Sequence, residues 1–226
     1  MRLHLPPSLR FALLASLVSF SGIYSYSHAA TSADFWQIPD FGGPDFTWTG
    51  AGEGDAVGTA GNWEGGSAPS RVDNKGPHLI FNGVDVTVTG TPPNTSDGGG
   101  ISVTGNGSVS VGLGQWGGNV YVEKGSSLTT SFGTQLKNME PEGHANIYVD
   151  GTLNMTTPGG NLNFDNGTGA DNHYWHIGLD GMINLSNTTT ITKNAKTWNV
   201  EVVVASAMEG LAVTNREMVD DALITR

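Results

Sequence analysis

The chain has 226 residues, with no cysteine, 33 glycines, and 21 acidic against ten basic residues. Nucleic acid is excluded as an expected partner, because phosphate binding depends on clustered Lys and Arg, which here are few and scattered. A disulfide-framed domain is excluded as well, so an apolar core and backbone hydrogen bonds must stabilise the fold.

The first 29 residues have the pattern of a secretory signal peptide. Arg2 and Arg10 precede an apolar run over residues 11–20, and small residues end the segment at Ala29. This run is too short to cross a bilayer, which needs roughly 20 apolar residues; an uncleaved anchor is the alternative. We expect cleavage after Ala29 and a secreted or cell-surface protein without a transmembrane span. The remaining eight basic and 21 acidic residues give a net charge of −13.

Short runs of alternating apolar and polar residues recur beyond residue 100, and a glycine turn divides each pair of runs. Alternation with period two places one set of side chains on a buried face. The Asp-Gly or Asn-Gly between runs supplies the positive φ angles that tight turns need. Four such units are Ile101–Val111, Asn119–Thr129, Asn146–Met155 and His176–Leu185. The sequence therefore predicts an all-β fold built from strand, glycine turn and strand.

Two architectures produce such units. In an antiparallel β-sandwich each unit is a hairpin, for which Asp-Gly is a strong signal. In a right-handed parallel β-helix (β-solenoid) each unit is a corner, and successive turns of the chain stack and bury a shared apolar interior. We favour the β-helix over residues 91–204, because a similar unit recurs at irregular intervals. The antiparallel β-sandwich remains the alternative.

The sequence changes character after residue 204. Glycines become rare, Ser206 and Glu209 have the spacing of a capping box, and Leu211 and Met218 fall close to a helical stripe. We expect a short helical segment over residues 205–226, which would shield an open β edge or begin a further domain.

A block near the start of the exported chain resembles a known module. The block contains Phe46–Gly50, Gly61–Gly66 with Asn62-Trp63, then Pro69, Asp73 and a strand ending at Phe81. It resembles the opening module of large exported bacterial β-helical proteins with autotransporter-associated strand repeats. The resemblance implies a parallel β-helix passenger, secreted or displayed at the cell surface, that serves in adhesion or as a structural stalk. It divides the chain into a linker (residues 30–45), a capping module (residues 46–90) and the stacked body.

Two tryptophans in this module are expected to be structural. Trp48 and Trp63 can cover the apolar end of a stack with large rigid side chains, while the neighbouring glycines let the chain turn around them. A sugar-binding platform is the alternative, because an exposed indole can stack on a pyranose ring. We favour the structural role, since each Trp lies among turn residues next to a strand.

The candidate ligand-binding residues are the remaining prominent aromatics. Trp116 lies between glycines, and His173, Tyr174 and Trp175 form a cluster with His176. Exposed aromatics of this kind would make a carbohydrate-binding module, which is our second hypothesis. Histidines three apart in a strand point to opposite faces, so no metal site is expected from the cluster.

The third hypothesis is a β-helical polysaccharide lyase or glycoside hydrolase. Such an enzyme needs positioned carboxylates or a calcium site with a basic residue. Carboxylates occur at Asp150, Asp165, Asp171 and Asp180, but basic side chains are sparse between residues 100 and 200. We therefore expect a non-catalytic module that contacts cell-surface or extracellular glycans or proteins, with no cofactor; a structural calcium ion is kept as an alternative. The sequence does not specify an oligomeric state.

Overall fold

The structure is a computed structural model. It describes residue 38 and residues 40–93, 98–116, 118–138, 146–156, 161–166, 173–178, 180–186, 190–193, 200–208 and 211–219. The predicted signal peptide over residues 1–29 lies outside this part of the chain. No helix in the described part is both long and apolar enough to cross a membrane.

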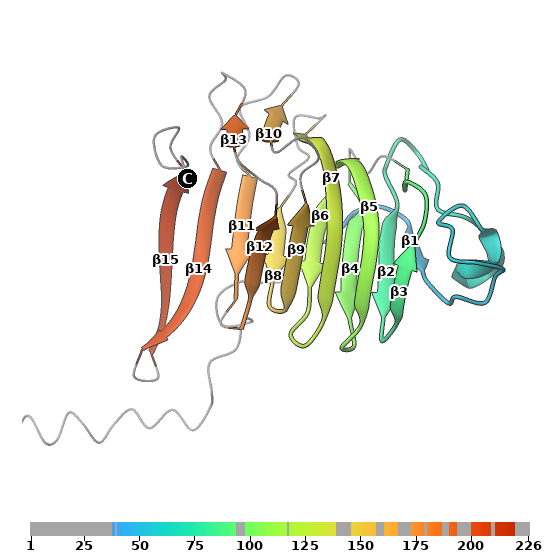
Figure 1. The fold of residues 1–226 in the computed structure, drawn as a ribbon, viewed down its shortest axis with the longest axis horizontal. Coiled ribbons are helices and arrows are strands. Elements are labelled where there is room, and N and C mark those ends of the chain that lie inside the picture. The colour runs from blue at the N-terminus through green and yellow to red at the C-terminus, as the bar shows by residue number, and fades with distance from the viewer. Residues whose placement is uncertain are drawn as a thin grey trace, which may run out of the picture.

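The strands of the described residues form two sheets (Figure 1). The first sheet has, in order, β1 (Asp45–Thr47), β2 (His78–Asn82), β4 (Gly100–Thr104), β6 (Asn119–Val122), β8 (Ile147–Val149), β11 (His173–Ile177), β14 (Val200–Met208) and β15 (Leu211–Val219). The second sheet contains β3 (Asp85–Val88), β5 (Ser108–Trp116), β7 (Ser127–Asn138), β9 (Thr152–Thr156), β12 (Met182–Ser186), β10 (Asn161–Asn166) and β13 (Thr190–Lys193). Two 3₁₀ turns, η2 (Ala60–Asn62) and η3 (Glu64–Gly66), lie between β1 and β2.

The chain passes from one sheet to the other at the predicted glycine turns. The turn at Gly107 joins β4 to β5, and the turns at Gly125, Gly151 and Gly181 join β6 to β7, β8 to β9 and β11 to β12. The two strands of a unit therefore do not pair with each other. Each pairs in parallel with the equivalent strand of the neighbouring unit. The all-β prediction is confirmed as two mainly parallel sheets, and the antiparallel β-sandwich alternative is wrong.

Parallel register places equivalent apolar side chains in rows through the interior. Cα partners in these rows are Leu79, Ile101 and Val120 in the first sheet, and Val109, Leu128 and Leu153 in the second. All six side chains are at most 1 % exposed, and they belong to one cluster that draws on both sheets. Burying a side chain of this size contributes roughly 1.5–3 kcal/mol. The shared interior is therefore the main stabilising feature of the fold.

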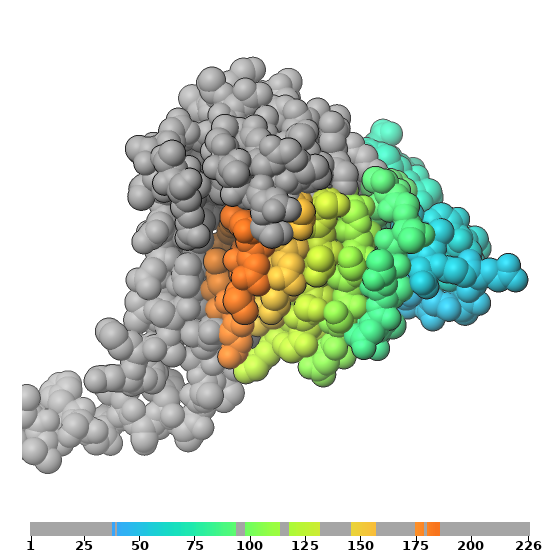
Figure 2. Space-filling view, in the orientation of Figure 1, coloured from blue at the N-terminus to red at the C-terminus, as the bar shows by residue number. Residues whose placement is uncertain are grey.

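Two of the turn glycines are required by the close approach of neighbouring backbone. A Cβ atom at Gly151 would lie 2.3 Å from the carbonyl oxygens of Glu123 and Ser126, and one at Gly181 would lie 2.0 Å from that of Val149. The glycines let successive passes of the chain lie directly against each other, which Figure 2 shows as adjacent bands of colour.

Trp48 and Trp63 lie at the β1 end of the core, the position that a cap requires. Trp48 is 4 % and Trp63 2 % exposed, and their rings meet edge to face with centroids 5.0 Å apart. Both rings also contact Phe81 of β2. The Trp63 indole N–H donates to the carbonyl of Val57 at 2.8 Å, so the ring is buried without losing its hydrogen bond.

The neighbouring Asn62 organises the glycine-rich loop before it. Its fully buried side-chain amide donates to the carbonyls of Gly54 and Ala56, and its Oδ1 accepts from the amide of Gly52. A buried amide that satisfies three backbone groups fixes the loop around it. The Asn-Trp motif is therefore explained by packing and hydrogen bonding within the capping module.

The prediction of a helical segment over residues 205–226 is wrong for the residues that the structure describes. Residues 205–208 continue β14, and Leu211–Val219 forms β15. The two strands pair antiparallel, with Val200 opposite Val219 at one end and Met208 opposite Leu211 at the other. Pairing with an adjacent strand outweighs the weak helical preference of the segment.

We predict that Gly151→Ala destabilises the protein by about 1–3 kcal/mol, the usual cost of forcing extra volume into a packed site. The added methyl group would meet two backbone carbonyl oxygens, which cannot move without disturbing the parallel pairing. Gly58→Ala is the matched control, because no atom lies within 4 Å of its added Cβ, and it should change stability by less than about 0.5 kcal/mol. Urea unfolding measures the stability of both variants, and equal unfolding midpoints for the two would contradict this account of the turns.

Candidate functional site

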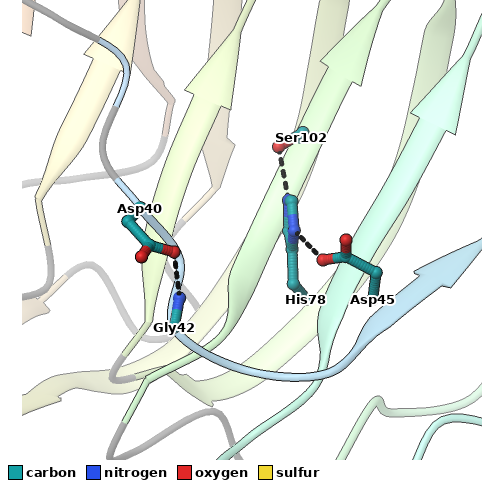
Figure 3. A network of polar contacts seen from close by, with 5 residues as sticks. All are labelled: Asp40, Gly42, Asp45, His78 and Ser102. Atoms are coloured by element: carbon teal, nitrogen blue, oxygen red, sulfur yellow. Dashed lines mark hydrogen bonds and ion pairs between the residues drawn. The ribbon is translucent and has the colours of Figure 1, made fainter.

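Three polar side chains form a hydrogen-bonded row across β1, β2 and β4, on the face of the first sheet that points away from the core (Figure 3). His78 Nδ1 lies 2.8 Å from Asp45 Oδ1, and His78 Nε2 lies 2.6 Å from Ser102 Oγ. Asp45 is largely exposed, whereas His78 and Ser102 are 9 % and 6 % exposed. We call this group the clamp.

The register of the sheet brings the clamp together. Asp45 and His78 are Cα partners, and the next residue in that row is Gly100. Because Gly100 has no side chain, the Phe41 ring occupies the space above it, and a Cβ there would lie 2.5 Å from Phe41 Cδ1. Ser102 is two residues further along β4 and therefore on the same face.

Burial favours the neutral form of His78. Burial lowers the pKa of His78 below its ordinary value of 6.5, and this effect exceeds the opposing influence of the Asp45 hydrogen bond and of the Asp45 and Asp40 charges. The network assigns the tautomer: Nδ1–H donates to the Asp45 carboxylate, and Nε2 accepts from the Ser102 hydroxyl.

The order of atoms in the clamp is that of a Ser-His-Asp catalytic triad, but two requirements of acyl transfer are missing. The Ser102 hydroxyl is buried beside the stacked rings of Phe41 and His78, whose centroids are 3.8 Å apart. The adjacent amides that could stabilise an oxyanion are already bonded, because Gly99 donates to Phe41 and Gly100 to Pro77. In the described structure the Ser102 hydroxyl is therefore covered, and these two amides are engaged.

The clamp fastens the segment at residues 40–44, which we call the strap. The His78 amide donates to the Pro44 carbonyl at 2.8 Å, and the Phe41 carbonyl accepts from Gly99. Phe41 also packs with Tyr121 and Tyr148 of the first sheet in a second buried cluster. The strap therefore crosses the outer face of the first sheet and covers part of it.

A shallow polar groove of about 600 Å³ follows the glycine turns. It is lined by residues 106, 124–127, 150–152 and 180. Lys124 Nζ and Asp180 Oδ2 are 2.7 Å apart, and because both side chains are largely exposed, solvent weakens the pair. The Ser126 hydroxyl has no hydrogen bond, but because it is buried, a ligand in the groove cannot reach it.

Of the predicted ligand-binding residues, only Trp175 has a side chain within the described part of the structure. Trp175 is 7 % exposed and lies in the core in register with Ile147, so its predicted exposure is wrong. His173 and Tyr174 belong to β11 and Trp116 ends β5, but their side chains lie outside the described part. The alternation of β11 explains the burial, since Trp175 and Ile177 share a face.

Comparisons give no further assignment. No protein-family model, curated protein or solved structure matches the chain. Within the described residues there is no group of three or more His, Asp or Glu side chains that could hold a metal ion.

We predict that Ser102 does not react with a fluorophosphonate reagent directed at activated serines. Mass spectrometry of the treated chain should find no adduct on Ser102 at neutral pH, because the hydroxyl is buried and the nearby Gly99 and Gly100 amides are already hydrogen-bonded. Rapid labelling that disappears in Ser102→Ala and in His78→Gln would show an activated nucleophile and contradict the structural role.

Proposed function

We propose that the chain is an exported, non-catalytic β-solenoid module of the cell surface, which serves as a structural element or in adhesion through the outer flanks of its stack. The observation that carries the proposal is the repeated parallel pairing of equivalent strands in two sheets around one apolar interior. This pairing is the arrangement that stacked solenoid turns require.

The outer face of the second sheet supports a role in surface contact. It carries neutral hydroxyl and amide groups in rows across neighbouring strands. Ser127 donates to the Ser108 hydroxyl at 2.9 Å, and Asn184 donates to Asn154 Oδ1 at 2.8 Å. These side chains form hydrogen bonds with one another and remain exposed to solvent. Such a face suits contact with a polar glycan or protein surface.

The same observations weaken the carbohydrate-binding alternative. Trp175, one of its expected stacking residues, is buried. The enzyme alternative receives no support from Asp180, whose carboxylate is paired with Lys124, or from the clamp, whose serine is covered.

The absence of cysteine allows a direct test of surface display. Thr129→Cys places a thiol on the exposed face of β7, and Leu128→Cys places one in the interior. On intact cells that express the chain with its own first 29 residues, a membrane-impermeant maleimide should label the Thr129→Cys variant. The Leu128→Cys variant should be labelled only after denaturation, because Leu128 is fully buried.

The two neighbouring positions serve as each other's control. Labelling of Thr129→Cys only after cell lysis would show that the chain is not displayed and would contradict the proposed location. Equal labelling of both variants on intact cells would contradict the buried interior instead.

A further inference from the structure

We propose that the strap is a pH-sensitive cover: it lies closed over the outer face of the first sheet while His78 is neutral, and acidification opens it and exposes the aromatic side chains beneath. The proposal concerns residues 40–44, the clamp, and the cluster of Phe41 with Tyr121 and Tyr148. It does not depend on the proposed adhesive function.

Two of the contacts that hold the strap involve His78. The Phe41 ring stacks on the imidazole with an angle of 4° between the planes, and the His78 backbone amide bonds the Pro44 carbonyl. One further backbone bond joins Gly99 to Phe41, and the Gly42 amide bonds Asp40 within the strap. The imidazole therefore contacts the strap at Phe41, whereas the backbone of β2 holds Pro44.

The charged groups around His78 determine the direction of the effect. Asp45 of β1 and Asp40 of the strap favour the protonated ring. Lys75 Nζ lies near Gly42 of the strap, and Ser102 of β4 is uncharged. The lowering effect of burial on the His78 pKa exceeds the raising effect of the two carboxylates, so the closed form has a His78 pKa below 6.5.

When the strap opens, the imidazole regains water and binds a proton more readily. The closed strap is therefore fully stabilised above the ordinary histidine pKa and loses stability as the pH falls below about 6.5. Protonation reverses the hydrogen bond to Ser102, because Nε2–H can then only donate to the hydroxyl oxygen.

The surface under the strap consists of outward-pointing residues that are nevertheless buried. Tyr121 and Tyr148 are 7 % and 8 % exposed, and they are partners in register. Burial is the largest cause that raises the pKa of Tyr121 to about 12, with the charges of Asp150 and Glu123 adding to it. Tyr148 stacks in turn on His176, so removing Phe41 would uncover the edge of a continuous aromatic row.

Amide hydrogen exchange followed by NMR on the full chain tests the proposal with two adjacent amides. Gly99 donates to Phe41 in the strap, whereas Gly100 donates to Pro77, which lies outside the strap. After correction for intrinsic rates, protection of Gly99 should fall severalfold between pH 7.5 and pH 5, while protection of Gly100 stays constant. Phe41→Ala should lower the protection of Gly99 at both pH values.

His78→Gln should abolish the pH dependence, and His176→Gln is the matched control that should retain it, because His176 stacks on Tyr148 rather than on Phe41. The Gly100 amide reports in each variant whether the sheet remains folded. Equal protection of Gly99 at the two pH values, or a pH effect that persists in His78→Gln, would overturn the proposal.

Discussion

The interior shared by the two sheets is the constraint on which the rest of the structure depends. Side chains alternate along each strand, so one residue in two points inward, and parallel register aligns the inward residues of neighbouring strands. Leu79, Ile101 and Val120 form one such row, and Leu128 with Leu153 belongs to another. A shift of one residue in any pairing would place polar side chains in this interior, so the core itself fixes the register.

The turns and the β1 end follow from this constraint. Neighbouring passes of the chain lie so close at the turns that Gly151 and Gly181 have no room for a Cβ. At β1 the apolar rows end against Trp48 and Trp63, whose contacts with each other and with Phe81 keep the end of the core from water. The outer face of the first sheet is then free to carry the clamp and to receive the strap.

Local pattern predicted the elements well, whereas it left their partners open between two architectures. The glycine-divided units and their inward residues follow from period-two alternation, but alternation is the same in a hairpin and in a stacked pair. The choice between them depends on contacts across about 20–30 residues of sequence, which no local signal encodes. Within β11, alternation places Trp175 on the same face as Ile177. The burial of Trp175 could therefore have been predicted had the whole strand been considered.

The clamp and the last strand were missed for related reasons. His78 is 33 residues from Asp45 and 24 from Ser102, so only the register of β1, β2 and β4 brings them together. The stretch Leu211–Val219 has apolar residues at spacings compatible with a helix, yet its pairing with β14 makes it a strand. In the first case the interacting segments are distant in sequence, and in the second the pairing with the adjacent strand decides the outcome.

Cross-linking of paired cysteines tests the parallel stack most directly, since the natural chain has none. Thr129 and Asn154 are partners in register across β7 and β9, with strands about 4.8 Å apart, so Thr129→Cys with Asn154→Cys should be joined by a short bifunctional thiol reagent. In a hairpin Thr129 would instead face Asn119 of β6, which belongs to the other sheet here. The account predicts efficient joining of the first pair and none of Asn119→Cys with Thr129→Cys; the reverse pattern would contradict it.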